Sequence, residues 1–583
     1  MVKYIFVIGG VISGVGKGVA AASIGKILQK YGHDVTAIKI DPYINCDAGT
    51  LRPTEHGEVW VTEDGGETDQ DLGNYERFLR INVPKRNNIT TGQIYKTIID
   101  KERNGSFLGQ TVQFIPHVIE EIKSRIVEGA DEHGIAIVEI GGTVGDYENI
   151  AFLLAAKKLE RELGRGNVIY ILVSYLPVPM NIKEAKTKPT QQSIRMLYEL
   201  GIFPDFILCR ALEPIDDVRK SKIASYININ EEDIISAPDT LTLYQIPLNF
   251  EKENLGKKIL QKLNLIGESQ PDWSDWQKLI SRLTEPKNSV NIAIVGKYLD
   301  IGNFTLEDSY ISIKQSLLHG GAHLDIQPNI FWINSKDFEK DPEKLQSLND
   351  YDGVIVPGGF GSSGVEGKIK AIKYCRENRI PYLGLCYGLH LAVVEIARSK
   401  IDAQADTTEN APETSCPVID LLPKQKEMLK ENKYGATMRL GAYAAKLEEN
   451  TIVYDLYKKF SNPQTLEEVK IMQNSPTTVK IDWKLRVGNT PAPIVFERHR
   501  HRYEVNPQYH DVLQKAGIIF SGYHLTEENT KLVEFIELSR DVHPFFVATQ
   551  AHPEFKSSFD KPSPLFAGFL DSCLKKKTSS KLK

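Results

Sequence analysis

Cysteine is scarce in this chain, and its few cysteines are scattered. The 583 residues contain six, at Cys46, Cys209, Cys375, Cys386, Cys416 and Cys573, and no two form a Cys-x-x-Cys pair. This distribution excludes a disulfide framework and the common kind of structural zinc site. Free thiols are typical of a reducing compartment, so we expect a cytoplasmic protein.

The chain also lacks long hydrophobic runs and a large excess of one charge. No uncharged stretch is long enough to cross a bilayer, and glycines interrupt the apolar N-terminal run, unlike a signal peptide. The formal net charge is −5. We therefore expect neither nucleic acid nor a membrane as a partner. The basic residues 576–583 are interpreted as a solvated, disordered tail.

Short apolar runs alternate with helical patterns through the first half of the chain. β-Branched residues are frequent in these runs, as in strands buried on both faces of a parallel sheet. The runs lie at 4–10, 34–41, 135–142, 168–176 and 205–210. The alternation predicts an α/β domain over residues 1–266, built on a parallel sheet.

The strand pattern stops and then restarts, which predicts a second domain. Residues 267–289 are interpreted as a linker, and new apolar runs follow at 290–298, 352–359 and 380–388. Residues 290–575 are therefore expected to form a second α/β domain. Within it, the polar residues 461–493 show no core pattern and are interpreted as an inserted surface loop.

A glycine-rich loop follows the first predicted strand. The loop GGVISGVGKG (9–18) leads into a helix, whose N-terminus and N–H groups favour a phosphate that Lys17 can also reach. The Walker A match is imperfect, because Val11 replaces the first glycine and Gly18 replaces the Ser or Thr that binds Mg²⁺. We favour nucleotide binding over a purely structural turn, with the loop resembling a P-loop.

Carboxylates would then have to hold the magnesium ion. Asp69 and Asp71 lie in the segment GETDQDLGNYERF (66–78), and Glu139 ends an apolar strand, where ligands of parallel sheets bind. Each of these acids could equally be a solvated charge, although Glu139 within an apolar strand needs a partner. The segment EAKTKPTQQS (184–193) also has two equally good interpretations, since its lysines suit either a triphosphate site or an exposed loop.

The second domain contains a candidate nucleophile. The segment GLCYG (384–388) lies between a predicted strand and a helix, and its spacing presents Cys386 on a sharp turn at the helix N-terminus. This position favours a thiolate. The alternative is a buried structural cysteine, which fits Cys375 because no such turn surrounds it.

A base and an orienting group follow later in the chain. His552 and Glu554 come after the apolar run 545–550 and point the same way in extended chain, so the carboxylate can orient the imidazole. The loop VPGGFG (356–361) offers N–H groups for an oxyanion hole. Together, these motifs predict a cysteine nucleophile with a His–Glu pair.

These segments, in this order, resemble the CTP synthase family over essentially the whole chain. The matching segments are GGVISGVGKG, KIDPYINCDAGT (39–50), EHGEVWVTEDGGETDQDLGNYERF (55–78), KTKPTQ (186–191), VPGGFG, GLCYG, TMRLG (437–441), ERHRHRYEVN (497–506) and HPEF (552–555). Many matches in one order are far more specific than any single motif.

The resemblance implies an N-terminal amidoligase synthetase domain and a C-terminal class I glutamine amidotransferase domain. ATP would phosphorylate O4 of UTP, Cys386 would release ammonia from glutamine, and His552 would act as acid and base. Ammonia would pass internally to C4 of the uracil, which keeps it unprotonated and close to its target. The family also implies Mg²⁺, activation by GTP, feedback inhibition by CTP, a homotetramer and, in many members, filaments.

The resemblance assigns site residues position by position. ATP is matched by Ser13, Gly14, Val15, Gly16, Lys17, Gly18, Lys39 and Asp71, and Mg²⁺ by Asp71 and Glu139. UTP or CTP is matched by Ser13, Asp146, Tyr147, Glu148, Lys186, Thr187, Lys188, Pro189, Thr190, Gln191 and Lys222. Glutamine is matched by Gly359, Tyr387, His390, Glu409 and Arg502, with oxyanion N–H groups from Gly359 and Tyr387. Leu108 matches a position near the ammonia route.

The chain departs from the family pattern in four places, one of which is the segment 461–493, longer than bacterial members usually have. His390 stands where the family commonly has a glutamine that contacts the substrate, and an imidazole has a different reach. The sequence around Glu409 is DTTEN instead of the usual Asn-Ser-Thr-Glu-Phe, and Ile311 replaces a lysine of some members near the activator region. We therefore expect a changed glutamine contact but unchanged thiol chemistry.

Two other functions are alternatives to this interpretation. Another amidoligase, such as a relative from the cobyrinate or biotin pathways, should lack KTKPTQ and ERHRHRYEVN. A filament-forming or regulatory paralogue with a disabled glutaminase should lack part of the predicted triad, whereas Cys386, His552 and Glu554 are all present.

Overall fold

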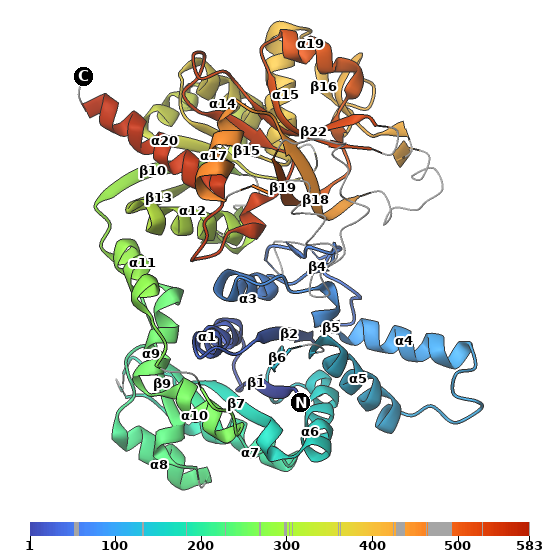
Figure 1. The fold of residues 1–583 in the computed structure, drawn as a ribbon, viewed down its shortest axis with the longest axis vertical. Helices are drawn as coiled ribbons and strands as arrows, with labels where there is room; N and C mark the ends of the chain where they lie inside the picture. The colour runs from blue at the N-terminus through green and yellow to red at the C-terminus, as the bar shows by residue number, and fades with distance from the viewer. Residues whose placement is uncertain are drawn as a thin grey trace. The chain divides into compact units, whose positions relative to one another are not determined.

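Two compact units divide the chain in the computed structural model (Figure 1). One unit comprises Met1–Thr50 and Glu67–Ile280, and the other comprises Leu51–Gly66 and Ser281–Lys583. The structure describes all residues except 52–56, 131–132, 182–183, 228, 268–269, 297–299, 302–303, 306, 360, 362, 424, 427–437, 462, 465–492, 527–528 and 582–583. Among the described residues, no helix is long and apolar enough to cross a membrane.

A seven-stranded parallel sheet forms the core of the first unit. The strand order is β5-β2-β6-β1-β7-β8-β9, and each of these pairings is parallel. The strands are β1 (Lys3–Gly9), β2 (Val35–Asp41), β5 (Asn88–Thr90), β6 (Ile135–Ile140), β7 (Val168–Tyr175), β8 (Phe206–Ala211) and β9 (Ile234–Pro238). The apolar runs predicted from the sequence form β1, β2, β6, β7 and β8 and are largely buried, as expected for a sheet covered on both faces, whereas β5 and β9 lie outside those runs.

Helices cover both faces of this sheet (Figure 1). Tyr4, Phe6 and Ile8 of β1 share one apolar cluster with residues of α4 to α8, whereas α1 packs on the strands from the other side. The helices are α1 (Lys17–Lys30), α3 (Asp71–Leu79), α4 (Thr91–Arg103), α5 (Ile119–Ala130), α6 (Ile150–Leu163), α7 (Lys188–Glu199), α8 (Asp217–Ile227), α9 (Ile246–Lys252) and α10 (Leu255–Lys262).

The second unit is built on a nine-stranded mixed sheet in the order β13-β10-β14-β15-β23-β22-β21-β18-β19. The first five strands are parallel neighbours, and the remaining pairings are antiparallel. The strands are β10 (Asn288–Gly296), β13 (Ile326–Asn334), β14 (Gly353–Val356), β15 (Tyr382–Leu385), β18 (Arg439–Leu447), β19 (Ile494–His501), β21 (Ile519–Leu525), β22 (Lys531–Glu537) and β23 (Phe546–Thr549).

Helices also pack against this second sheet. They are α12 (Ile311–Leu324), α13 (Ser335–Lys340), α14 (Val365–Glu377), α15 (Tyr387–Lys400), α17 (Ile452–Phe460), α19 (His510–Lys515) and α20 (Pro564–Lys581). The segment predicted as a linker contains α11 (Ser274–Thr284), within which the two units divide. Most of the loop predicted at 461–493 lies outside the described residues.

The prediction of a disordered tail over residues 576–583 is wrong as far as Lys581, because α20 continues through it. Lys576 Nζ donates to the Tyr351 carbonyl oxygen at 2.6 Å, and Lys577 Nζ donates to that of Ser289 at 2.7 Å. Long lysine stems can lie along a protein surface while their charged ends find acceptors. The basic composition therefore belongs to a docked helix.

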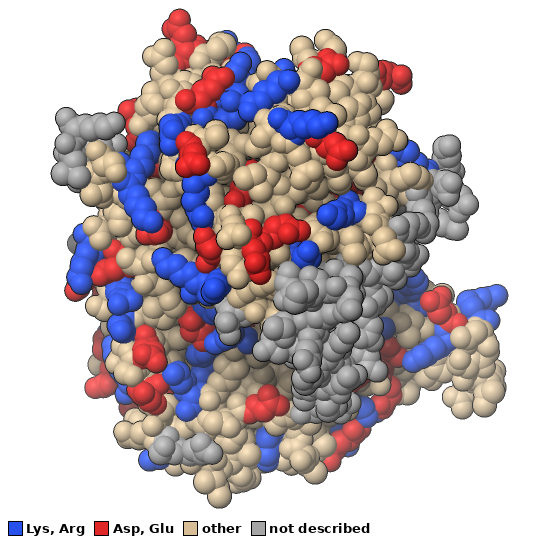
Figure 2. Space-filling model, turned by 45° about the horizontal axis from the view of Figure 1, so that its top comes forward, with Lys and Arg blue, Asp and Glu red and all other residues tan. Residues whose placement is uncertain are grey.

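Charge is mixed on the molecular surface. On the face shown in Figure 2, Lys and Arg side chains are interspersed with Asp and Glu side chains. This pattern accords with the formal net charge of −5.

The docking of α20 can be tested at Leu570, which is fully buried. Leu570→Ala should lower the free energy of unfolding by about 2–5 kcal/mol, because it removes buried methyl groups and leaves a cavity. Urea unfolding followed by circular dichroism measures the change. Ser579→Ala, at an exposed position of the same helix, should change it by less than about 0.5 kcal/mol. Equal effects of the two substitutions would contradict this packing.

Candidate active sites

Lys17 lies where the glycine-rich loop meets α1. Gly14 and Gly16 adopt φ angles of 71° and 83°, in the left-handed region that favours glycine. Lys17 is 8% exposed, and its Nζ donates to the Gly142 carbonyl oxygen at 2.7 Å, just beyond the end of β6. Burial lowers the pKa of Lys17, although Glu139 opposes this effect. A cation at a helix N-terminus beside turning N–H groups suits a phosphate.

Asp71 and Glu139 converge on Gly18. A Cβ atom built on Gly18 would lie 2.7 Å from Asp71 Oδ1 and 3.4 Å from Glu139 Oε2. Lys39 forms ion pairs with Asp71 and, at 2.8 Å, with Asp41. The glycine that breaks the Walker A pattern thus leaves room for two carboxylates where that pattern has a hydroxyl.

The pKa values of these carboxyl groups are shifted in different directions; Glu139 is buried, whereas the Asp71 side chain is 28% exposed. Burial and then Asp71 raise the pKa of Glu139 to about 7, and burial raises that of Asp69 to about 7 against the effect of Lys39. Burial would also raise the pKa of Asp71, but Lys39 holds it below its ordinary value. Tyr75 donates a hydrogen bond to Glu139. Crowded carboxylates of this kind gain from a nearby cation.

The candidate metal ligands are few. Among the described residues, no three His, Cys, Asp or Glu side chains group closely enough to hold a metal ion. Asp71 and Glu139, meeting at Gly18, do fit Mg²⁺, since this ion usually takes one or two carboxylates and completes its shell with phosphate oxygens and water.

Helix α7 brings the lysine-rich segment beside the glycine loop. A Cβ atom on Gly10 would lie 3.0 Å from Ser193 Oγ and 3.1 Å from Ser174 Oγ. Ser174 Oγ in turn lies 2.9 Å from Thr190 Oγ1, and Lys188 begins the helix. The structure therefore places this part of the predicted UTP site next to the loop.

The remaining residues predicted for UTP or CTP are spread around this region. Asp146 accepts hydrogen bonds from Thr143 N at 2.6 Å and from Thr143 Oγ1 at 2.8 Å, and Tyr147 is 87% exposed. Lys186 pairs with Glu184 at 2.9 Å. Lys222 lies on α8, which packs against α7.

Cys386 occupies the sharp turn between β15 and α15. Its φ of 49° and ψ of −101° are unusual for a residue with a side chain, so the surrounding structure must hold it. Its N–H donates to the Thr549 carbonyl oxygen at 2.7 Å, and its own carbonyl accepts from Leu389 N at 2.9 Å. A Cβ atom on Gly388 would lie 2.2 Å from the Val356 carbonyl oxygen, so the turn requires that glycine.

His552 faces Cys386 across Gly358. A Cβ atom on Gly358 would lie 3.0 Å from His552 Cε1 and 3.6 Å from Cys386 Cβ. His552 Nδ1 lies 2.8 Å from Glu554 Oε1. Burial would lower the pKa of His552, but Glu554 and Cys386 outweigh it and raise the pKa to about 10. A protonated imidazole beside the sulfur is the arrangement that stabilises a nucleophilic thiolate.

Predicted glutamine-binding residues surround this turn. Glu409 Oε1 accepts a hydrogen bond from Gly361 N at 3.2 Å, next to the predicted oxyanion glycine, Gly359. Burial and Glu409 raise the pKa of Tyr503, whereas Arg502 lowers it. Glu409 and Arg502 therefore lie near the same ring. Asn410, the neighbour of Glu409 in the chain, donates to the Tyr387 hydroxyl at 2.6 Å, at the start of α15.

His390 lies behind Cys386. The side chain is 2% exposed, and its Nε2 lies 2.8 Å from Gln550 Oε1. Gln550 Nε2 in turn donates to Cys386 Sγ at 3.9 Å. Burial lowers the pKa of His390 to about 4, so the imidazole is neutral. A direct contact between His390 and glutamine stays a prediction.

The sequence did not reveal Gln550 as part of this site, and it revealed Gly358 only as a member of the loop VPGGFG. Gln550 directly follows β23, two residues before His552, and Gly358 precedes Gly359 in the predicted oxyanion loop. The signal that could have identified them is their position next to motifs that the sequence analysis recognised.

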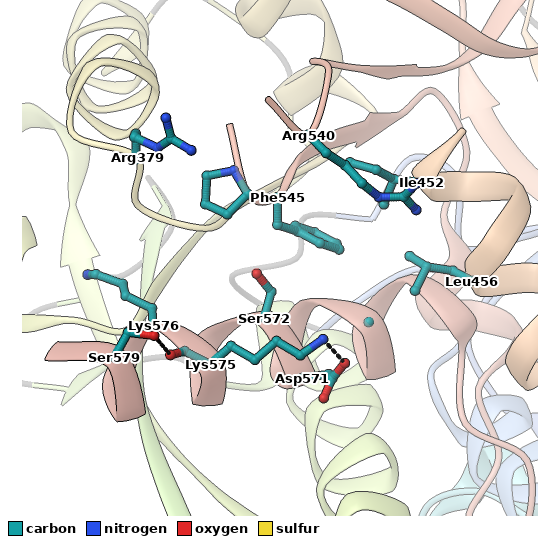
Figure 3. A pocket seen from close by; sticks show the side chains of 12 residues that line it. Arg379, Ile452, Leu456, Arg540, Phe545, Asp571, Ser572, Lys575, Lys576 and Ser579 are labelled. Carbon is teal, nitrogen blue, oxygen red and sulfur yellow. Dashed lines mark hydrogen bonds and ion pairs between the residues drawn. The ribbon is translucent and has the colours of Figure 1, made fainter. Parts of the chain in front are cut away.

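A cavity of about 570 Å³ in the second unit is not part of this site (Figure 3). Its lining includes Leu456, Phe545 and side chains of α20, and none of the predicted site residues. Lys575 at its edge is paired with Asp571 at 3.0 Å. The cavity offers no group for the predicted chemistry.

The fold and the second site define a class of protein: a glutamine amidotransferase domain joined to a parallel-sheet synthetase domain. Residues 3–265 match the family model described as CTP synthase N-terminus, and residues 305–572 match that of glutamine amidotransferase class-I. The chain belongs to the CTP synthase family, as the sequence motifs indicate.

Relatives named CTP synthase match nearly the whole chain. That of Methanocaldococcus jannaschii is 47% identical over 583 residues, covering 99% of each chain. Those of Pyrococcus furiosus and Sulfolobus acidocaldarius are 45% and 46% identical, covering 98% of this chain and 97% and 99% of their own. A solved Trypanosoma brucei CTPS glutaminase domain with bound acivicin is 32% identical, with a TM-score of 0.40, covering 49% of this chain and 94% of that one.

The role of Gly18 can be tested by adding one methyl group. Gly18→Ala should weaken binding of ATP with Mg²⁺ by about tenfold or more, because the new Cβ displaces the Asp71 carboxylate. Isothermal titration calorimetry measures the affinity. Gly134→Ala is the control, since its Cβ would meet only the Asp34 carbonyl oxygen, at 3.3 Å. Unchanged affinity in Gly18→Ala would show that the carboxylates do not serve this site.

The His552–Glu554 pair can be tested with Glu554→Gln. Glutamate release from glutamine should fall about 10²- to 10⁴-fold, because the imidazole loses the carboxylate that orients it and raises its pKa. The pair should also stabilise the folded protein below the ordinary histidine pKa, and this advantage over the variant should decline as the pH rises toward about 10.

Two measurements check this prediction: steady-state glutamate release, and urea unfolding at several pH values. Glu449→Gln, at an exposed position, should match the wild type in both. Rapid glutamate release by Glu554→Gln would contradict the role given to the pair.

Proposed function

We propose that this chain is a glutamine-hydrolysing CTP synthase, which aminates UTP to CTP at the expense of ATP. One observation carries the proposal: a chain similar to CTP synthases along nearly its full length retains the paired His552 and Glu554 beside Cys386. We expect the enzyme to work in the cytoplasm.

In the glutaminase reaction, Cys386 Sγ attacks the side-chain amide carbon of glutamine. N–H groups of Gly359 and Tyr387 stabilise the oxyanion. His552 gives its proton to the leaving ammonia and a thioester forms on Cys386. Water then attacks the thioester, His552 takes a proton from it, and glutamate leaves with the thiolate restored.

In the synthetase reaction, Lys17 and the glycine loop, with Lys39 nearby, bind the phosphates of ATP. Lys186, Lys188, Gln191 and Lys222 bind UTP. The γ-phosphoryl group passes to O4 of the uracil, ammonia adds at C4 after internal transfer, and inorganic phosphate leaves. Asp71 and Glu139 would hold Mg²⁺, which neutralises phosphate charge when bound.

The proposal extends to regulation. Asp146 and Glu148 are expected to contact the cytosine ring of CTP acting as a feedback inhibitor. GTP is expected to activate glutamine hydrolysis, with Ile311 altering the strength of its effect. A homotetramer and filaments are the expected assemblies.

The test is CTP formation from UTP, ATP and Mg²⁺ with either glutamine or ammonium as nitrogen donor. CTP should form with both donors. CTP from neither donor would overturn the proposal, and CTP from ammonium alone would show that the pocket around His390 does not use glutamine.

Cys386→Ala separates the two half-reactions. Glutamine-dependent CTP synthesis should disappear, because no sulfur remains to attack the amide, whereas ammonium-dependent synthesis should continue. The same assay with each donor measures both. Cys46→Ser, which changes an exposed cysteine, should retain both activities. Equal loss of the two activities in Cys386→Ala would contradict this division of labour.

A further inference from the structure

Residues 58–66, which group with the second unit, carry a buried carboxylate. Glu63 is 4% exposed; its Oε2 accepts a hydrogen bond from Arg498 Nε at 2.9 Å, and its Oε1 accepts one from Lys556 Nζ at 2.9 Å. Arg498 also donates to the Val61 carbonyl oxygen at 2.9 Å. Burial would raise the pKa of Glu63, but Lys556 and Arg498 lower it to about 2. The three side chains therefore form a charged cluster at physiological pH.

Both cations of this cluster belong to the surroundings of His552. The carbonyl oxygen of Arg498 accepts a hydrogen bond from His552 N at 2.7 Å. Lys556 ends the short 3₁₀ helix that directly follows His552 and contains Glu554. The carboxylate of Glu63 is thus connected to the beginning and to the end of the turn that carries the catalytic base.

Trp60 reaches the same turn through an aromatic contact. Its ring is fully buried and lies 4.9 Å from that of Phe555, between centroids. Phe555 in turn stacks on the His552 imidazole, with centroids 5.2 Å apart and an angle of 16° between the planes. Close packing of this kind leaves a ring few orientations, so Trp60 limits the movement of the imidazole.

We propose that Trp60 and Glu63 are positioning residues for glutamine hydrolysis, holding the turn of His552 and Glu554 in the orientation that faces Cys386. The inference rests on the proposed function. Trp60 acts through Phe555, and Glu63 acts through Arg498 and Lys556, so neither has to touch glutamine.

Residues 58–66 come from the N-terminal part of the sequence, although they group with the second unit. Residues 58–66 fall within the range that matches CTP synthase N-terminus, and outside the range that matches glutamine amidotransferase class-I. They continue directly into β4 (Glu67–Thr68) and then α3, which begins with Asp71. The glutaminase site is therefore completed by sequence from the synthetase part of the chain.

The test uses the full chain with Trp60→Ala and, separately, Glu63→Gln. In each variant, kcat for glutamate release should fall about 10- to 100-fold, because small displacements of a catalytic group are costly. KM for glutamine should stay within about twofold, since the predicted glutamine-binding residues are untouched. Trp60→Phe should restore most of kcat, and CTP synthesis from ammonium should persist in all three variants.

Trp332→Ala is the matched control, because it removes another tryptophan of the same unit that stacks on a tyrosine, Tyr310, at 5.8 Å. It should release glutamate at the wild-type rate. Wild-type glutamate release by Trp60→Ala and Glu63→Gln would overturn the inference, as would parallel losses of glutamate release and ammonium-dependent synthesis. Because glutamate release is measured apart from CTP formation, a wild-type enzyme that makes no CTP counts against the proposed function instead.

Discussion

Charged side chains buried near the strand ends must be paired within the protein, and this constraint organises both units. Lys39, with a side chain 3% exposed, pairs with Asp71 in the first unit. Arg439 bridges Glu504 at 3.1 Å and Glu534 at 2.6 Å in the second. Removing one partner from such a pair costs about 3–5 kcal/mol, a large part of a domain's stability. The first pair therefore fixes the start of α3, which carries Asp71, and the second ties β18 to β22, the neighbour of β23, which leads to His552.

Glycines make the space that this pairing requires. At Gly18 the missing side chain lets two carboxylates approach the helix N-terminus, and at Gly358 it lets the imidazole approach the sulfur. The same constraint shapes the nucleophile turn, where Gly388 lies against a backbone carbonyl. Both sites thus depend on close approach of backbone and charged groups: a methyl group at Gly18 or Gly358 would crowd functional side chains, and one at Gly388 would clash with the backbone carbonyl that packs against the turn.

The sequence predicts those features of the fold and of the sites that depend on short, local patterns. The central strands of both sheets follow from short apolar runs, whereas the outer strands, such as β5, β9 and β19, were not predicted; Cys386 and His552 follow from motifs with fixed spacing. The grouping of residues 58–66 with the second unit was not predictable, because it depends on contacts such as that of Glu63 with Arg498, 435 positions apart. The helical C-terminus was mistaken for the same reason: its lysines find acceptors only in the folded domain.

The environment of His390 shows what a histidine does at a position where the family pattern leads us to expect a glutamine. A neutral imidazole that meets the oxygen of Gln550 must donate through Nε2, which leaves the Gln550 amide nitrogen directed toward Cys386. A glutamine at this position would carry donor and acceptor together on one amide, whereas Nε2 of a neutral imidazole is a donor in one tautomer and an acceptor in the other. Burial keeps the imidazole neutral across the physiological range, so this orientation does not change with pH. With the Gln550 oxygen facing Nε2, an N–H group of Gln550 is left aimed at the sulfur, and such a donor stabilises the thiolate on which glutamine hydrolysis depends.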